Sequence, residues 1–189
     1  MSGKFYHTKE SVEQYIKIAE GYDGSELIEK LQKFLPNNSS LLELGSGPGT
    51  DLKILKESYQ ITGSDYSAIF VNLLKDKYPS TTINHLNAVT LETDRKFDGV
   101  YSNKVLQHLT DDELKKSIQN QVKILTDSGI VCHSFWEGNI CEEMHGSLQN
   151  YHAIKEIKQF FFPLFDILIL ELYNEISKND SILLIGRKK

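Results

Sequence analysis

The sequence predicts an α/β protein in which helices cover both faces of a mostly parallel sheet. Short apolar runs suited to buried strands alternate with amphipathic segments along most of the 189 residues. Such alternation requires crossover connections between parallel strands. The carboxyl-terminal part breaks the alternation, because only the polar turn "SKND" separates its two strand-like runs. A turn that short fits an antiparallel hairpin, so we expect a three-layer structure with a mixed sheet.

The elements are expected in the following order. Two helical segments come first, at about 9–20 and 24–34, and the second closes at Pro36. Leucine-rich or β-branched runs then predict parallel strands at 40–45, 59–64, 81–86, 97–102 and 129–135. Helical patterns lie between most of them, at 50–58, 67–78 and 110–125. Thr110 and Glu113 open the last helix with capping-box spacing. The hairpin strands, 165–176 and 181–189, complete a seven-stranded sheet.

Composition restricts the class of partner. A formal charge of −5 argues against non-specific nucleic-acid binding, which depends on clustered Lys and Arg. Cys132 and Cys141 are too few for a disulfide framework and favour a reducing, cytoplasmic setting. The apolar region 160–173 is interrupted by Pro163, Asp166 and Glu171, so no membrane span is expected.

The stretch "LLELGSGPGTDL" at 41–52 predicts a ligand site. Gly45, Gly47 and Gly49 follow the first strand and open a helix. In a parallel sheet such a turn lies at the carboxyl edge, where ligands bind. No Gly-Lys-Ser/Thr follows, which excludes a P-loop, and Thr50 stands where a dinucleotide-binding turn has its third glycine.

Two carboxylates restrict the chemical class of the ligand. Glu43 lies two residues before the first glycine, where it would repel a pyrophosphate but attract an ammonium or sulfonium group. Asp65 ends the second strand, twenty residues after Gly45, a position from which a carboxylate accepts hydrogen bonds from ribose hydroxyls. Asp65 alone would suit NAD equally well.

These residues resemble the glycine-rich motif E/D-x-G-x-G-x-G of the class I S-adenosylmethionine-dependent methyltransferases of the small-molecule type. The resemblance covers about residues 15–189 and implies a Rossmann-like fold with S-adenosylmethionine as cofactor and S-adenosylhomocysteine as its product. It places the backbone of the glycine turn against the methionine part of the cofactor, near Glu43. It places Asp65 at the ribose and Tyr66 at the adenine. The cofactor-binding residues that it implies in and beside the turn are Glu43, Gly45, Ser46, Gly47 and Gly49.

Two segments depart from the commonest family pattern or match it loosely. The third strand often ends in Asp-Ala, whereas this chain has Asn87 and Ala88, and an Asn carbonyl can accept the adenine N6 bond without charge. The segment "SNKVLQHL" resembles the family's polar residue followed by Leu-x-His, which places Asn103, Leu106 and His108 near the cofactor.

The acceptor is deduced by elimination. The chain has neither the Asp/Asn-Pro-Pro-aromatic motif nor the Pro-Cys pair of base-methylating relatives, and it lacks the acidic ligands of the magnesium-dependent catechol group. A small-molecule acceptor remains, with protein side chains next. A displacement at an activated methyl group needs alignment more than a base. If a proton must leave, His108 or His145 is the expected base.

The expected acceptor pocket contains Tyr15, Trp136, His145 and Tyr151, whereas His133 is expected to be structural. Cys141 and His145 have i, i+4 spacing but too few further ligands for a metal, so no metal is expected.

The domain organisation expected is one methyltransferase domain over 1–189. Residues 1–36 would form an N-terminal helical lid, in which Tyr22 and Asp23 resemble the aromatic-acid pair that many family members fold over the cofactor. Residues 40–135 would form the cofactor half, and residues 136–189 the acceptor half. The expected partner is a small-molecule acceptor, and neither nucleic acid nor a membrane is expected to bind. The protein is expected to be a monomer or a homodimer. A cofactor-binding protein without catalysis, a protein methyltransferase and an NAD-dependent oxidoreductase stay open as alternatives.

Overall fold

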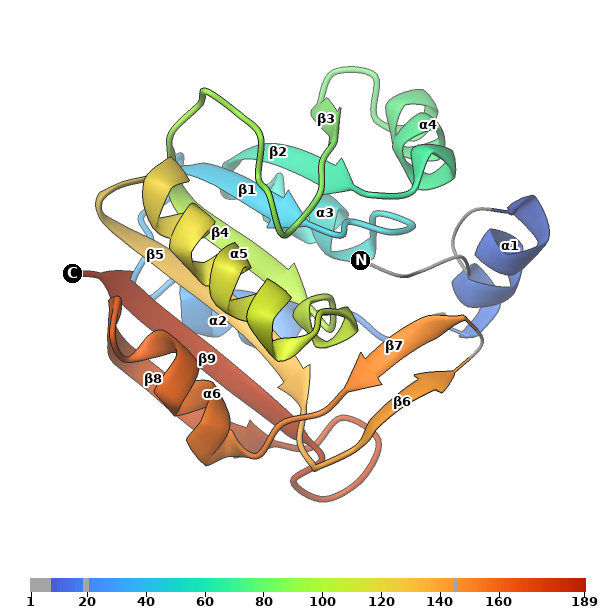
Figure 1. The fold of residues 1–189 in the computed structure, drawn as a ribbon. Helices are drawn as coiled ribbons and strands as arrows, with labels where there is room; N and C mark the ends of the chain where they lie inside the picture. The colour runs from blue at the N-terminus through green and yellow to red at the C-terminus, as the bar shows by residue number, and fades with distance from the viewer. Residues whose placement is uncertain (1–7, 19–20, 145) are drawn as a thin grey trace.

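The computed structural model describes residues 8–18, 21–144 and 146–189. Its main sheet has seven strands, and the glycine turn at 45–49 follows β1 (Ser40–Leu44), one of the central strands (Figure 1). Across the sheet the strands are β3 (Thr82–His85), β2 (Gln60–Asp65), β1, β4 (Phe97–Asn103), β5 (Leu125–Trp136), β9 (Ser181–Lys188) and β8 (Phe165–Tyr173).

Strand pairing confirms the predicted mixed sheet. Parallel pairs join β1 to β2 and β4, β2 to β3, and β4 to β5. Strand β9 is antiparallel to both β5 and β8, as the short turn before it predicts. Strand β8 ends three residues before the predicted boundary at 176. The cause is the Asp180 carboxylate, which accepts hydrogen bonds from the backbone of Glu175, Ile176 and Ser177 and turns the chain.

Helices cover both faces of the sheet, as predicted. Helices α2 (Ser25–Leu31), α3 (Thr50–Leu55) and α4 (Ala68–Lys77) belong to one face, and α5 (Asp111–Ile124) and α6 (Ile154–Phe161) to the other (Figure 1). Helix α1 (Lys9–Ile18) contacts α4. Thr110 and Glu113 form the predicted capping box of α5. No helix within the described residues is both long enough and apolar enough to cross a membrane.

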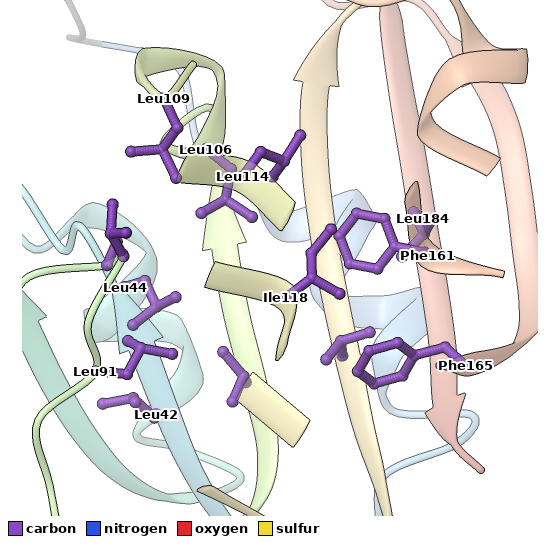
Figure 2. Close-up of a cluster of buried hydrophobic side chains, with 14 of the residues drawn as sticks. Leu42, Leu44, Leu91, Leu106, Leu109, Leu114, Ile118, Phe161, Phe165 and Leu184 are labelled. Atoms are coloured by element: carbon purple, nitrogen blue, oxygen red, sulfur yellow. The ribbon is translucent and has the colours of Figure 1, made fainter. Parts of the chain in front are cut away.

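The largest hydrophobic cluster lies between the sheet and the α5–α6 face. Figure 2 shows Leu42 and Leu44 of β1 beside Leu91, with Ile118 of α5 nearer Phe161 of α6. Leu41 packs on the opposite face, because successive strand residues point to opposite sides. Leu41 and Leu42 thus make β1 apolar on both faces just before Glu43. Leu91 belongs to the loop between β3 and β4, which covers this part of the face in place of a helix.

Two features of the carboxyl-terminal part were not predicted. The chain after β5 forms a separate hairpin of β6 (Cys141–Met144) and β7 (Ser147–Asn150), and α6 follows it. The hairpin strands are short and largely polar, so they lack the apolar alternation that marks a strand. Helix α6 carries Ile154, Ile157 and Phe161 at helical spacing, but this pattern runs into the apolar stretch 160–162 and is obscured by it.

Candidate functional site

A cleft follows the carboxyl ends of β1, β2 and β4 and contains two adjoining pockets. The pockets share Tyr15, Gly45, Gly47, Asn103 and Lys104. Pocket A extends toward β2 and is also lined by Leu44, Ser64, Asp65, Tyr66, Ser67, Phe70, Leu86, Ala88, Val105 and His108. Pocket B extends toward α3 and is also lined by Tyr22, Glu43, Ser46, Pro48, Thr50, Asp51 and Glu175.

The glycine turn exposes its backbone to this cleft, because glycine has no side chain. The backbone conformation and close neighbours of the turn also disfavour larger residues. Gly45 and Gly49 have φ of 66° and 80°, in the left-handed region that favours glycine. A Cβ at Gly45 would lie 2.5 Å from Cγ2 of Val105. The residue type at this position is thus fixed both by the backbone conformation and by the close approach of the segment after β4.

Asp65 joins the end of β2 to the glycine turn. Its Oδ2 accepts a hydrogen bond from the Gly47 amide at 2.9 Å, and its Oδ1 accepts one from the Ser67 amide at 2.7 Å. Burial raises the pKa of Asp65, and these two amide donors oppose that shift. A carboxylate can accept about four bonds, and the Tyr66 amide is a third donor to Asp65, so acceptor capacity remains for a ligand in pocket A.

The neighbourhood of Asp65 provides flat and apolar surfaces. The ring of Tyr66 stacks on His85, with ring centroids 5.8 Å apart and planes inclined by 18°. Ala88 is buried and lines pocket A, whereas Asn87 does not line either pocket and its Oδ1 accepts a bond from the Val89 amide. The sequence placed Asn87 and Ala88 together at the cofactor, but the structure places only Ala88 in the cleft lining.

Glu43 is a buried carboxylate at the floor of pocket B. Its side chain is 3% exposed, and its Oε2 atom has no hydrogen-bond partner among the residues that the structure describes. Burial is the main reason that its pKa is raised to about 8, and the nearby charges of Asp51 and Asp65 add to the shift. An unpartnered buried carboxylate oxygen costs stability, so a ligand with a positive group would relieve it.

Asp51, in the first turn of α3, was not among the predicted site residues. Its Oδ1 accepts a bond from the Gly24 amide at 2.7 Å, and its Oδ2 accepts from the Tyr101 hydroxyl at 2.7 Å and the Asn103 amide at 3.0 Å. Burial raises its pKa, and these three donors oppose the shift. Asp51 therefore ties the segment before α2 and the end of β4 to the glycine turn.

Lys104, directly after β4, was also missed by sequence reasoning. Its φ of 54° is unusual for a residue with a side chain, and its amide donates to Ser134. Its ammonium lies 3.0 Å from a Glu175 carboxylate oxygen and 3.8 Å from the centroid of the Trp136 ring. Burial lowers its pKa to about 8, against the opposing effect of Glu175.

Two of the predicted histidines, His108 and His133, lie in different parts of the described structure. His108 lines pocket A, and its Nδ1 lies 2.8 Å from the carbonyl oxygen of Leu148 in β7. Burial lowers the pKa of His108, so the ring is neutral at pH 7. His133 is fully buried, with Ser102 and Gln121 each 2.8 Å from one ring nitrogen, as a structural histidine would be. His145 lies outside the described residues.

The predicted acceptor residues are only partly brought together. Tyr15 lines both pockets, and burial raises its pKa to about 12. Trp136 and Tyr151 contact each other, with ring centroids 6.3 Å apart, but neither lines pocket A or B. Lys104 connects them to the cleft through its contact with Trp136. Tyr22 is 48% exposed at the outer rim of pocket B, and Leu106 is buried in the core.

Known methyltransferases are similar to this chain in sequence. Residues 42–131 match a family model described as a methyltransferase domain. An uncharacterized methyltransferase from Oceanobacillus iheyensis is 27% identical over 194 aligned residues, which cover 93% of this chain and 87% of that protein.

Two solved structures show the same fold at low sequence identity. The N-methyltransferase NodS from Bradyrhizobium japonicum, in complex with S-adenosylhomocysteine, matches with a TM-score of 0.75 and 15% identity, covering 95% of this chain and 97% of that chain. The 1,6-didemethyltoxoflavin-N1-methyltransferase from Burkholderia thailandensis, with bound 1,6-didemethyltoxoflavin and S-adenosylhomocysteine, matches with a TM-score of 0.78 and 15% identity. That match covers 93% of this chain and 82% of that chain.

Replacing Glu43 by Gln should stabilise the ligand-free protein increasingly as the pH rises. The pKa of Glu43 is raised to about 8 in the folded state, well above the value of roughly 4.3 expected when unfolded. A raised folded pKa contributes stability that is present below the unfolded value and is lost as the pH rises through the folded value. Glu43→Gln removes that loss, which amounts to about 1.4 kcal/mol per pKa unit. Urea unfolding at pH 5.5 and pH 8.5 measures it, and an equal difference at both pH values would contradict the assignment.

The contact between Lys104 and Trp136 gives an optical readout, because Trp136 is the one tryptophan in the sequence. As Lys104 loses its proton, the charge over the indole disappears, and tryptophan emission should change with a midpoint at the Lys104 pKa of about 8. Lys104→Met should abolish the transition, whereas Glu43→Gln should keep it. A transition that survives in Lys104→Met would assign it to another group.

Proposed function

We propose that the chain transfers a methyl group from S-adenosylmethionine to a small-molecule acceptor. It has the fold of S-adenosylmethionine-dependent methyltransferases, and its residues 42–131 match a methyltransferase domain. The observation that carries this proposal is the buried carboxylate of Glu43 and the half-buried carboxylate of Asp65, on either side of the glycine turn. One suits the ammonium end of the cofactor and the other its ribose.

The residues of the cleft fit the parts of that cofactor. The unpartnered Oε2 of Glu43 suits a positive group in pocket B. Asp65 keeps acceptor capacity for a ribose hydroxyl, and the apolar lining of pocket A from Phe70, Leu86 and Ala88 suits an adenine ring. A buried carboxylate beside the glycine turn would repel the pyrophosphate of NAD, which speaks against the oxidoreductase alternative.

The cofactor supplies a methyl group already activated on a sulfonium, so the residues of the chain have to align the acceptor and exclude water. Tyr15 and Lys104 line the cleft where its two pockets meet, next to Asn103 at the end of β4. The acceptor is proposed to approach from the side of Lys104 and Trp136. The Burkholderia thailandensis enzyme, solved with bound 1,6-didemethyltoxoflavin, supports an acceptor of small size.

His108 is the proposed base when the acceptor must lose a proton. The Leu148 carbonyl can only accept a hydrogen bond, so the proton of the neutral ring resides on Nδ1. The lone pair then resides on Nε2, which is the atom that would take a proton. Residues 1–36 are proposed as a lid over the cofactor, because Tyr15 and Tyr22 from this part of the chain line pocket B.

Turnover with labelled S-adenosylmethionine and a metabolite extract tests the function. We expect one labelled small-molecule product, and its identity names the acceptor. Cofactor binding without any labelled product would favour a cofactor-binding protein without catalysis. A labelled protein would favour the protein methyltransferase, and NADH binding without S-adenosylhomocysteine binding would favour the oxidoreductase.

Asp65→Asn should weaken binding of S-adenosylhomocysteine by roughly tenfold to several hundredfold, because one or two charge-assisted hydrogen bonds to the ribose lose their charge. The Asn side chain keeps one acceptor oxygen for Gly47 or Ser67, so the turn is less disturbed than in Asp65→Ala. Calorimetry measures the affinity. Asp76→Asn, on the exposed side of α4, is the matched control and should bind like the wild type. Equal affinity in both variants would refute the role of Asp65.

A further inference from the structure

Pocket B contains two buried carboxylates, whereas the ligand proposed for it has one ammonium group. Glu43 and Asp51 are 3% and 8% exposed, and both line this pocket. The Oε2 atom of Glu43 has no partner within the described part of the chain. Asp51 Oδ1 accepts one hydrogen bond, from Gly24, so it keeps capacity for a second donor.

The other charged groups around pocket B do not neutralise these two carboxylates. Among the described residues that line pocket B, Lys104 in the segment after β4 is the one basic side chain. Its ammonium is paired with the Glu175 carboxylate at 3.0 Å. Asp65 of β2 and Asp23 before α2 are further negative groups that act on Glu43 and Asp51 respectively. The hydroxyls of Tyr15 from α1 and Tyr101 from β4 have pKa values raised by burial and stay neutral. The pocket thus has an excess of acidic groups, which an ammonium group in it would balance.

We propose that Glu43 and Asp51 together bind the primary ammonium group at the amino-acid end of the cofactor, and that Glu43 gives up a proton to solvent when this group arrives. The inference rests on the proposed function and adds Asp51 to its binding residues. In the empty site Glu43 is a neutral carboxylic acid. On binding, its O–H bond breaks, the proton goes to the buffer, and the carboxylate accepts a hydrogen bond from the ammonium.

Asp51 determines how much proton is released. Its negative charge is one cause of the raised pKa of Glu43, and three donors hold it in place. Removing that charge lowers the pKa of Glu43, because a like charge favours the neutral acid. An Asp51→Asn variant would already have more ionised Glu43 at pH 7 and would therefore release less proton on binding.

The test measures S-adenosylhomocysteine binding by calorimetry in buffers of different ionisation enthalpy, between pH 6.5 and 8.5. For the wild type we expect release of close to one proton at pH 7 and an affinity that rises by up to about tenfold per pH unit toward pH 8. Glu43→Gln should release none. Asp51→Asn should release less than the wild type at pH 7, and at pH 8.5 it should bind on the order of tenfold more weakly, because an ionic hydrogen bond is lost.

Two controls separate this site from general effects of charge. Asp76→Asn removes an exposed carboxylate of α4 that lines neither pocket, so proton release should equal that of the wild type. 5′-Methylthioadenosine has the adenosine part but no amino-acid end. It should bind without proton release, and Asp51→Asn should not change its affinity.

A measurement on the wild type covers the case in which Asp51→Asn does not fold. The carboxyl ¹³C resonance of Glu43 should titrate with a midpoint near 8 in the empty protein. It should lose that titration on adding S-adenosylhomocysteine and keep it with 5′-methylthioadenosine. The Asp51 resonance should shift with the first ligand alone.

The outcomes distinguish this inference from the proposed function. If the wild type binds S-adenosylhomocysteine without releasing a proton, or Asp51→Asn behaves as the wild type in both release and affinity, the two-carboxylate site is overturned and the function stands. If the wild type binds no S-adenosylhomocysteine, both are overturned.

Discussion

The parallel pairing of β1 with β2 and β4 is the constraint from which the cleft follows. Because the three strands run in the same direction, their carboxyl ends meet at one edge of the sheet. That edge receives Glu43 from β1, Asp65 from β2 and Asn103 from β4. The hydrogen bond from Gly47 to Asp65 then fixes the turn after β1 to the end of β2, and Asp51 fixes the same turn to β4. A strand in the opposite direction would remove one wall of the cleft.

The same edge of the sheet brings together ionisable groups whose burial is unfavourable. Glu43 lies between the leucines of β1, and it is 3% exposed. Burial disfavours the charged form of this side chain, so Glu43 costs free energy of folding in the ligand-free protein. The ligand proposed for pocket B would account for its presence, whereas folding does not. Stability has been given up at the positions that define the cleft.

How much of this was predictable depended on the distance along the chain between interacting residues. The glycine turn, Glu43 and Asp65 were found because a strand, a turn and a helix start are local patterns of residue type. The Asp51 hydrogen bonds join residues 27, 50 and 52 positions apart, and Lys104 meets Ser181 across 77 positions. No local pattern encodes such contacts. One indication of Asp51 was present in the sequence, which has an acidic residue there in the first helical turn after the glycines. Acidic residues are common at that position because they interact favourably with the helix dipole, so the indication was not specific.

The strand order has a consequence for how the chain folds during synthesis. Strand β9 lies between β5 and β8, although it comes after both in the sequence. While a ribosome is still adding residues before 181, the outer edge of β5 has no neighbour, and β8 has no strand to pair with. An unpaired strand edge is open to pairing with other chains. The nascent protein therefore needs protection at β5 until translation has passed β9, whereas the sheet from β3 to β5 can form earlier.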